Sequence, residues 1–112
     1  MSENNLNNVS AVLEQGSHFE GKLTFEGTAQ ISGDFTGEIF TKDCLIINEM
    51  AIVKAEIEAE IVIIRGRVEG NVFARKKVIM HPPAVFKGTV TSPSLRIDEG
   101  VVFEGASYVP NA

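Results

Sequence analysis

Few side chains in this 112-residue sequence could perform acid–base, nucleophilic or metal chemistry. The two histidines, His18 and His81, are the candidates for a general base near neutral pH, and neither has a serine or cysteine nucleophile at a recognisable spacing. Two histidines cannot supply a three-histidine metal site, and Cys44, the single cysteine, cannot form a cysteine-based zinc cluster or an intrachain disulfide. The sequence therefore predicts no catalytic, cofactor or metal residues, and we expect a protein that is not an enzyme.

Composition and charge exclude further classes of function. The sequence has no GxxxxGK[ST] motif for nucleotide phosphates, and its net charge of -5 argues against nucleic acid, which needs a basic face. One cysteine fits a reducing compartment, and the first residues lack the basic end and apolar core of a signal peptide. The apolar runs are far shorter than the roughly 20 residues of a membrane-spanning helix. We therefore expect a cytoplasmic protein that binds neither nucleotide nor nucleic acid.

The glycines mark a repeat of about 17 residues. The pattern apolar-x-small-x-apolar occurs six times, at intervals of 15 to 18 residues. Its small residues are Gly21, Gly37, Ala55, Gly70, Gly88 and Gly105. A second column, two positions before each later motif, holds Gly33, Ala51, Gly66, Ala84 and Val101. A third column holds the apolar pairs Ala29/Ile31, Leu45/Ile47, Ile61/Ile63, Val78/Met80 and Leu95/Ile97. Since the columns share one period, the whole chain from the first motif to the last is one repeated unit.

Each repeat alternates apolar and polar residues and is rich in Ile and Val, which is typical of strands. A hairpin meander has a unit of about 8–12 residues, whereas this unit is near 17 and contains about three short strands. One unit cannot bury its own apolar side, but units stacked about 4.8 Å apart can. The sequence therefore predicts an all-β, single-domain β-solenoid of about six turns. The motif's Phe or Val would fill the centre, and its small residue would point inward beside a corner, where a larger side chain would overpack.

The ordered series of motifs resembles the bactofilins, a family of bacterial cytoskeletal proteins. The stretches that carry the resemblance are "GSHFEGKLTFEG" at 16–27, "ISGDFTGEIF" at 31–40, "VEGNVFAR" at 68–75 and "TSPSLRIDEGVVFEG" at 91–105. The resemblance covers about residues 16–107 and implies a right-handed β-helix. It also implies nucleotide-independent assembly into non-polar filaments that act as scaffolds in cell-shape or cell-envelope processes. The expected domains are a disordered leader (1–15), the β-helix (16–107) and a short tail (108–112).

A solenoid has two open ends, and no capping helix is evident after the last repeat. Uncovered ends predict end-to-end stacking with other copies, and a filament in which like ends meet has no polarity. We expect the end contacts to come from apolar residues of the first and last turns, namely Phe19, Leu23, Phe25, Val101, Val102 and Phe103.

Charged residues of the third and fourth repeats lie one period apart. The alignment places Glu58 under Arg75 and Glu60 under Lys77, which predicts ion pairs between neighbouring turns. Such exposed pairs contribute little to stability. The alternative interpretation of these charges is a partner-binding patch on the basic stretch 65–77.

The leader offers one candidate for membrane contact. Leu6, Val9, Val12 and Leu13 could form one apolar helical face, and the resemblance implies a membrane-targeting tail in some family members. This leader has two glutamates and no Lys or Arg, so the usual attraction to anionic lipid is missing.

The sequence is best interpreted as a cytoplasmic scaffold whose main partner is itself. The resemblance implies cell-wall enzymes or the inner membrane as further partners. An alternative from another class is a β-solenoid binding module that does not polymerise and displays its flat faces to a cell-envelope partner. A third is an acyltransferase-like enzyme, whose six-residue repeats would give a stricter period than the one observed.

Overall fold

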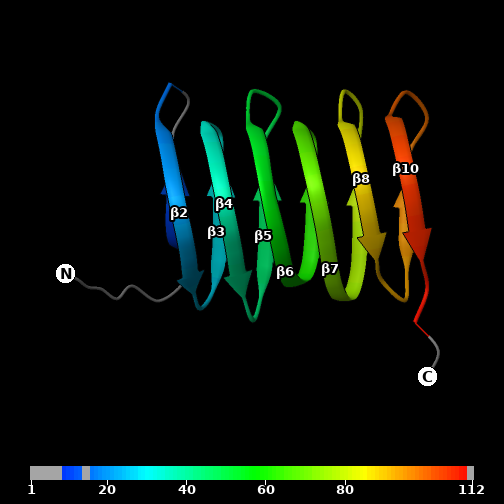
Figure 1. Cartoon of the computed structure of the whole chain (residues 1–112), viewed down its shortest axis with the longest axis horizontal. Coiled ribbons are helices and arrows are strands. Elements are labelled where there is room, and N and C mark those ends of the chain that lie inside the picture. Colours follow the sequence, from blue (N-terminus) through cyan, green and yellow to red (C-terminus); the bar gives the residue numbers. More distant parts are fainter. Residues whose placement is uncertain (1–8, 14–15, 111–112) are drawn as a thin grey trace.

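Ten strands make up the described part of the computed structural model, which comprises residues 9–13 and 16–110 (Figure 1). They are β1 (Val9–Leu13), β2 (His18–Phe25), β3 (Thr28–Ile31), β4 (Asp34–Thr41), β5 (Cys44–Ile47), β6 (Ile52–Ile64), β7 (Arg67–Met80), β8 (Val85–Thr91), β9 (Leu95–Ile97) and β10 (Val102–Tyr108). Every pairing is parallel, so the chain circulates in one direction and each turn lies on the one before it. The predicted β-solenoid is confirmed.

The strands form two continuous ladders. One runs β2–β4–β6–β7–β8–β10 and the other runs β1–β3–β5–β6–β7–β9, with the long strands β6 and β7 contributing to both. Phe19 and Phe103 belong to the first and last members of the same ladder, and five successive pairings separate them. The expected six copies of the motif are therefore all present, spaced by five complete turns.

The small residues of the repeat stack in one column, and the glycines among them have a reason that the prediction did not include. Each pairs with the next, from Gly21 through Ala55 to Gly105. A Cβ added to Gly37 would lie 1.9 Å from the carbonyl oxygen of Gly21 in the turn below, and Gly37 has a φ of 137°. Close approach of successive backbones and a left-handed φ exclude a side chain at this glycine. Ala55, the one alanine of the column, is buried in the core, as the prediction of a small inward residue requires.

The core is a set of inward columns that runs the length of the coil. Phe35, Val53, Val68 and Phe86 stack in one of them and are buried. The pair Leu45/Ile47 lies beneath Val62/Ile64, which are also buried.

The predicted alignment of Ile61 and Ile63 with the pair Leu45/Ile47 is wrong by one residue. The interval from Leu45 to its partner is 17 residues rather than 16, and β6 and β7 shift register between Ala59 and Ile61. Because strand side chains alternate, a one-residue shift moves both isoleucines to the outer face.

The number of strands in a turn depends on one corner column. Thr41 is the last residue of β4, and Ser92 directly follows β8. Both are buried, and their hydroxyls accept hydrogen bonds from the backbone N–H two residues on, at 3.1 and 3.3 Å, which turns the chain at this corner. Ala59 and Ala74 occupy the same column and cannot make this turn. As a result β6 and β7 continue around the corner for 13 and 14 residues, whereas the other complete turns contain two strands each, such as β4 and β5. The prediction of three short strands per turn is therefore wrong.

The N-terminal leader differs from expectation. Val9–Leu13 form β1, which pairs in parallel with β3 and aligns Leu13 with Ile31. These residues are therefore a strand and not the helix that was expected. The pairing with β3 explains this strand, because it provides hydrogen-bond partners for the backbone of Val9–Leu13. Leu6 lies outside the described residues.

Candidate assembly surfaces at the ends of the coil

Each end of the coil presents strands that are paired on one side only. Among the described residues, β1 and β2 pair only with β3 and β4, and β9 and β10 pair only with β7 and β8. Their outer edges carry backbone N–H and C=O groups that no other described strand covers (Figure 1). Unpaired edges of this kind are templates for strands of another chain.

The C-terminal end is apolar at its centre. The ring of Phe103 stacks on that of buried Phe86, with centroids 5.4 Å apart and planes 11° from parallel. Val101 and Leu95 are also partly buried and pack against the core. Each of these side chains covers the turn below and has no described turn above it.

The N-terminal end has the same construction. The ring of Phe19 stacks on Phe35 at 5.2 Å and 12°, and Phe19 remains 38% exposed. Leu23 and Phe25 are partly buried against the core. The three N-terminal residues predicted as end contacts are thus part of one end face.

Two residues at the C-terminal end depart from the prediction. Val102 is 47% exposed, but its column includes Ile52, which is 41% exposed in the middle of the coil. That column faces outward, so Val102 lies on the side of the coil rather than on its end face. Ile97, which was not predicted as an end contact, is 41% exposed and sits above buried Met80. Its place in the inward column of apolar pairs was the signal that could have identified it.

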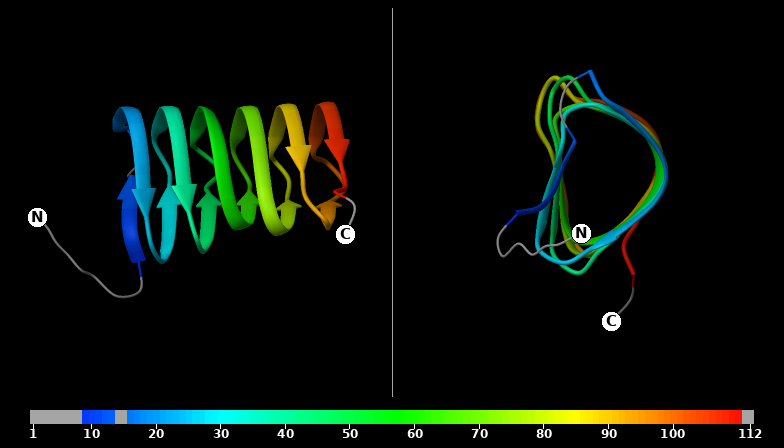
Figure 2. Two further views of the ribbon diagram at one scale, coloured as in Figure 1. Left: turned by 60° about the horizontal axis from the view of Figure 1, so that its bottom comes forward. Right: turned by 90° about the vertical axis from the view of Figure 1, so that its left-hand side faces the viewer.

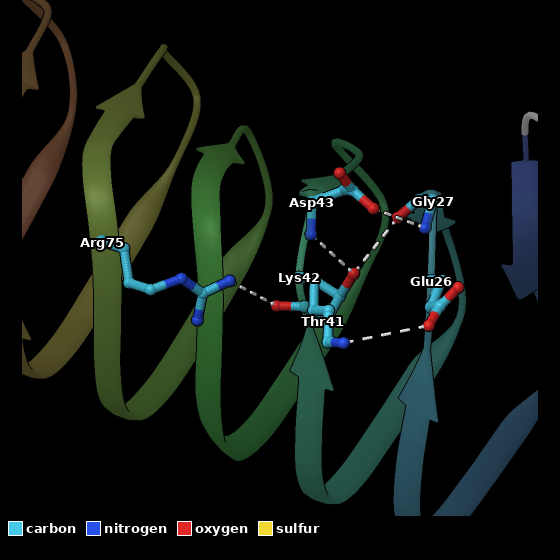
Figure 3. Close-up of polar contacts among 6 residues, drawn as sticks. All are labelled: Glu26, Gly27, Thr41, Lys42, Asp43 and Arg75. Atoms are coloured by element: carbon cyan, nitrogen blue, oxygen red, sulfur yellow. Dashed lines mark hydrogen bonds and ion pairs between the residues drawn. The ribbon is translucent and has the colours of Figure 1, made fainter.

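The charged residues form contacts between turns at one corner (Figure 3). Arg75 Nη1 lies 3.5 Å from Glu58 Oε2, while its Nη2 donates a hydrogen bond of 3.0 Å to the carbonyl oxygen of Thr41. Its guanidinium also lies 6.0 Å from the ring centroid of Phe40. Arg75 therefore links three consecutive turns.

The second predicted pair is not formed. Lys77 is opposite Ile61, and it is Lys76 that approaches Glu60, at 3.9 Å. The register shift after Ala59 explains the exchange, because β7 contains one more residue than β6 at this point. The contact is largely exposed and contributes little to stability.

The stretch Phe25-Glu26-Gly27, which repeats the motif letters out of register, forms the same corner one turn below (Figure 3). The Gly27 N–H donates to Asp43 Oδ2 at 2.8 Å, and the hydroxyl of Thr41 donates to the Gly27 carbonyl at 3.2 Å. Lys42 Nζ lies 4.0 Å from Glu26 Oε2. These contacts connect the corner at residues 26–27 with the corner at residues 41–43 in the next turn.

The residues that could take part in acid–base chemistry lie apart from one another. His18 is exposed, with Nε2 3.1 Å from Glu20 Oε2. His81 Nδ1 lies 2.7 Å from Asp98 Oδ2 at another corner, where hydrogen bonds from His81 and Arg96 hold the pKa of Asp98 below its ordinary value.

Cys44 is half-buried, and burial, with a smaller effect of the Asp43 charge, raises the pKa of its thiol. Within residues 9–13 and 16–110 no cluster of His, Cys, Asp and Glu could hold a metal ion, and no helix is long and apolar enough to cross a membrane.

The described residues thus form a parallel β-solenoid whose first and last strands have an unpaired edge, which places the protein in the class of stacked-repeat proteins. The family model described as "Bactofilin: Polymer-forming cytoskeletal" matches residues 11–108. The chain therefore belongs to the bactofilin family, whose members are cytoskeletal structural proteins.

Relatives of known sequence and structure agree with this assignment. Bactofilin BacO of Myxococcus xanthus (strain DK1622) is 31% identical over 97 residues, which are 87% of this chain and 77% of BacO. Bactofilin BacP of the same organism is 28% identical over 85 residues, and the chain spans 35% of its length.

Two solved structures share the fold. The solid-state NMR structure of the cytoskeletal bactofilin BacA is 29% identical, with a TM-score of 0.83 over 95% of this chain and 100% of that one. The cryo-EM reconstruction of Thermus thermophilus bactofilin double helical filaments is 27% identical, also with a TM-score of 0.83, over 89% of this chain and 99% of that one.

Proposed function

We propose that this chain is a cytoplasmic structural protein that assembles end to end into filaments without nucleotide. The observation that supports the proposal best is the pair of end faces, in which Phe19 and Phe103 each stack on a buried ring and have no described turn of the coil on their other side. Addition of another copy would pair the free strand edges and bury both rings, which satisfies backbone groups and removes apolar surface from water.

The filaments are proposed to be non-polar, with like ends in contact. Both end faces have an aromatic ring at the head of a continuous inward column, so each face can meet a second copy of itself. The filament-forming relative from Thermus thermophilus, with which the chain shares 27% identity and its fold, supports polymerisation. A scaffold of this kind would serve cell-shape or cell-envelope processes by displaying partners along its sides.

Negative-stain electron microscopy of the purified full chain tests the proposal. The sample is treated with apyrase, so that no nucleoside triphosphate remains, and is imaged across a range of salt and pH. We expect filaments in every nucleotide-free sample. Discrete particles under all conditions would contradict polymerisation and favour the alternative of a β-solenoid binding module that works as a single copy.

A further inference from the structure

Two opposite charges flank Gly21 on the outer face of β2, the strand that begins its ladder. They are Glu20 and Lys22, and both are exposed. The Glu20 side chain is 72% exposed and contacts His18 Nε2 at 3.1 Å through one carboxylate oxygen only. Lys22 forms no ion pair with any described residue. Both side chains can therefore meet charges of another copy.

The backbone groups of these two residues also face away from the coil. The carbonyl oxygen of Gly21 is directed at the next turn, since a Cβ added to Gly37 would lie 1.9 Å from it. Successive residues of a strand present their backbone N–H and C=O groups to opposite sides. The groups of Glu20 and Lys22 are therefore on the free edge of β2, where a strand of another copy would bind them.

The possible registers of a junction between two N-terminal ends are few. Successive turns follow nearly the same outline, so a copy that adds to this end lays its wall on this wall (Figure 2). Across a two-fold axis β2 then runs antiparallel to β2 of the other copy. Inward side chains remain inward only if a residue, and not a peptide bond, lies on the axis. Two such registers pair nearly the whole of β2, one centred on Gly21 and one on Lys22.

Charge separates these two registers. In the register centred on Gly21, Glu20 of each copy lies opposite Lys22 of the other, which gives two ion pairs. In the register centred on Lys22, the two lysines lie opposite each other, and like charges in that position are destabilising. Glu38 adjoins Lys22 within the same subunit in both registers and does not distinguish them.

The same residues disfavour a head-to-tail arrangement. In that arrangement β10 of one copy would continue the ladder onto β2 of the next, with Gly105 beside Gly21, as the small residues pair within the chain. Glu104 would then lie beside Glu20, which is a like-charge contact. The other outward residues of β10 are uncharged and offer no compensating cation.

We propose that Glu20 and Lys22 select the junction between N-terminal ends: they pair reciprocally across it, fix its register on Gly21 and disfavour a polar filament. This inference rests on the proposed end-to-end assembly. One exposed ion pair contributes little. The two-fold axis supplies two pairs, and every competing arrangement replaces attraction by repulsion, so the difference between arrangements is larger than either pair alone. Because β10 has no outward cation, this selection operates at one end of the coil only.

Reversal of charge tests the pairing. Glu20→Lys or Lys22→Glu alone brings like charges together at both positions, so we expect the critical concentration for sedimentable filaments to rise at least about five-fold. The double variant restores opposite charges and should return to within about two-fold of the wild type. Lys54→Glu is the matched control, because Lys54 is an exposed lysine in the middle of the coil. Single variants that polymerise like the wild type, or a double variant as defective as the single ones, would overturn the proposal.

A second measurement reads the register directly. In a Cys44→Ser background, Glu20→Cys and Lys22→Cys chains are mixed, assembled and oxidised with copper phenanthroline. Directly opposite, hydrogen-bonded residues have Cα atoms about 5.5 Å apart, which suits a disulfide, so the mixture should give roughly ten-fold more linked dimer than either variant alone. Linked dimers of Lys22→Cys alone would place Lys22 on the axis. Links between Glu20→Cys and Glu104→Cys chains would show head-to-tail contact, and either result contradicts the proposal.

The two proposals fail in different ways. Wild-type chain that forms no filament contradicts the proposed function itself. Wild-type filaments whose assembly neither single reversal weakens leave end-to-end assembly standing and remove the role of Glu20 and Lys22. Below its raised critical concentration, Glu20→Lys should persist as dimers joined at their C-terminal ends, and the additional Phe103→Arg should give monomers, as measured by analytical ultracentrifugation. Monomers of Glu20→Lys alone would contradict selection at one end only.

Discussion

The ring of Phe103 lies parallel to that of Phe86, 5.4 Å away, and closes the inward column at its C-terminal end. In Phe103→Arg a cation would replace the ring at the centre of the proposed junction. Bringing two such faces together would bury an unpaired charge, which is far more costly than losing an apolar contact. We expect discrete particles instead of filaments, measured by sedimentation and negative-stain microscopy.

Tyr108→Arg is the control for this substitution. Tyr108 belongs to the same strand, β10, and its column of register partners runs along the outer face of the coil. Filaments of this variant should be as long as those of the wild type. If Phe103→Arg also polymerises normally, the C-terminal face is not a junction.

The glycine column gives a prediction about stability. A Cβ at Gly88 would lie 1.9 Å from the Gly70 carbonyl oxygen, whereas one at Gly21 would meet nothing nearer than a ring carbon of Phe19 at 3.7 Å. Both glycines have a φ near 137° (139° and 135°), so the backbone strain of an alanine is shared. We expect Gly21→Ala to cost about 1–2 kcal/mol and Gly88→Ala at least about 4 kcal/mol.

Urea unfolding followed by circular dichroism measures this difference, in a Phe103→Arg background that keeps the chain from polymerising. Equal midpoints for the two alanine variants would show that the backbone of the turn below can move aside and that only φ matters.

Much of the fold could be predicted from the sequence because the small residue of the motif recurs in every turn and always pairs with its counterpart in the next turn. Gly21, Gly37, Ala55, Gly70, Gly88 and Gly105 pair in the predicted order without a single shift. The predicted cause, a small inward side chain, fits Ala55, which is buried in the core. It misses the contact between backbones that excludes a side chain at Gly37, Gly70, Gly88 and Gly105, because a pattern of side-chain types does not reveal such a contact. Periodicity identifies which residues stack on one another, but it does not identify which of their atoms are in contact.

The errors have one origin, the variable length of the corners. Ile61 and Ile63 were aligned with Leu45 and Ile47, and Lys77 was paired with Glu60, because both assignments assumed that every turn has the same number of residues between columns. At this corner β6 has one residue fewer than the turns before and after it, which moves each partner by one position. The end-contact residues on strand faces without such a shift, Phe19 and Phe103, lie where the repeat places them. The strand β1 was missed because Val9–Leu13 lack the motif.

Thr41 provides a test of the corner hydrogen bonds. Its buried hydroxyl donates to the Gly27 carbonyl and accepts from the Asp43 N–H. Thr41→Val keeps the side-chain shape and leaves both groups without this partner, so we expect a loss of about 1–3 kcal/mol. Thr36→Val, at an exposed position of the same strand, should change the free energy of unfolding by less than about 0.5 kcal/mol. Similar urea midpoints for the two variants would contradict this reading of the corner.

The Asp98 corner predicts a pH dependence. Hydrogen bonds from His81 and Arg96 lower the pKa of Asp98 in the folded chain below that of an unfolded aspartate, which is about 3.9. The stabilisation is therefore complete above that value and is lost as the pH falls through the lower pKa of the folded state. The melting temperature of the chain should decline more steeply below about pH 4 than that of Asp98→Asn.

Differential scanning calorimetry between pH 2 and pH 7 gives this comparison, with Glu99→Gln as a neighbouring exposed control. Parallel melting curves for the wild type and Asp98→Asn across the acid range would show that the contact with His81 does not contribute to folding stability.

The parallel course of every strand has a consequence for the proposed junctions. Within one subunit the chain circulates in a single sense, so all neighbouring strands run the same way. When two like ends meet across a two-fold axis, the sense of circulation reverses. The edge strands on either side of the junction must then run antiparallel, with the hydrogen-bond pattern of an antiparallel ladder. In a non-polar bactofilin filament the direction of the strands therefore reverses at every junction, while all neighbouring strands within one subunit run parallel.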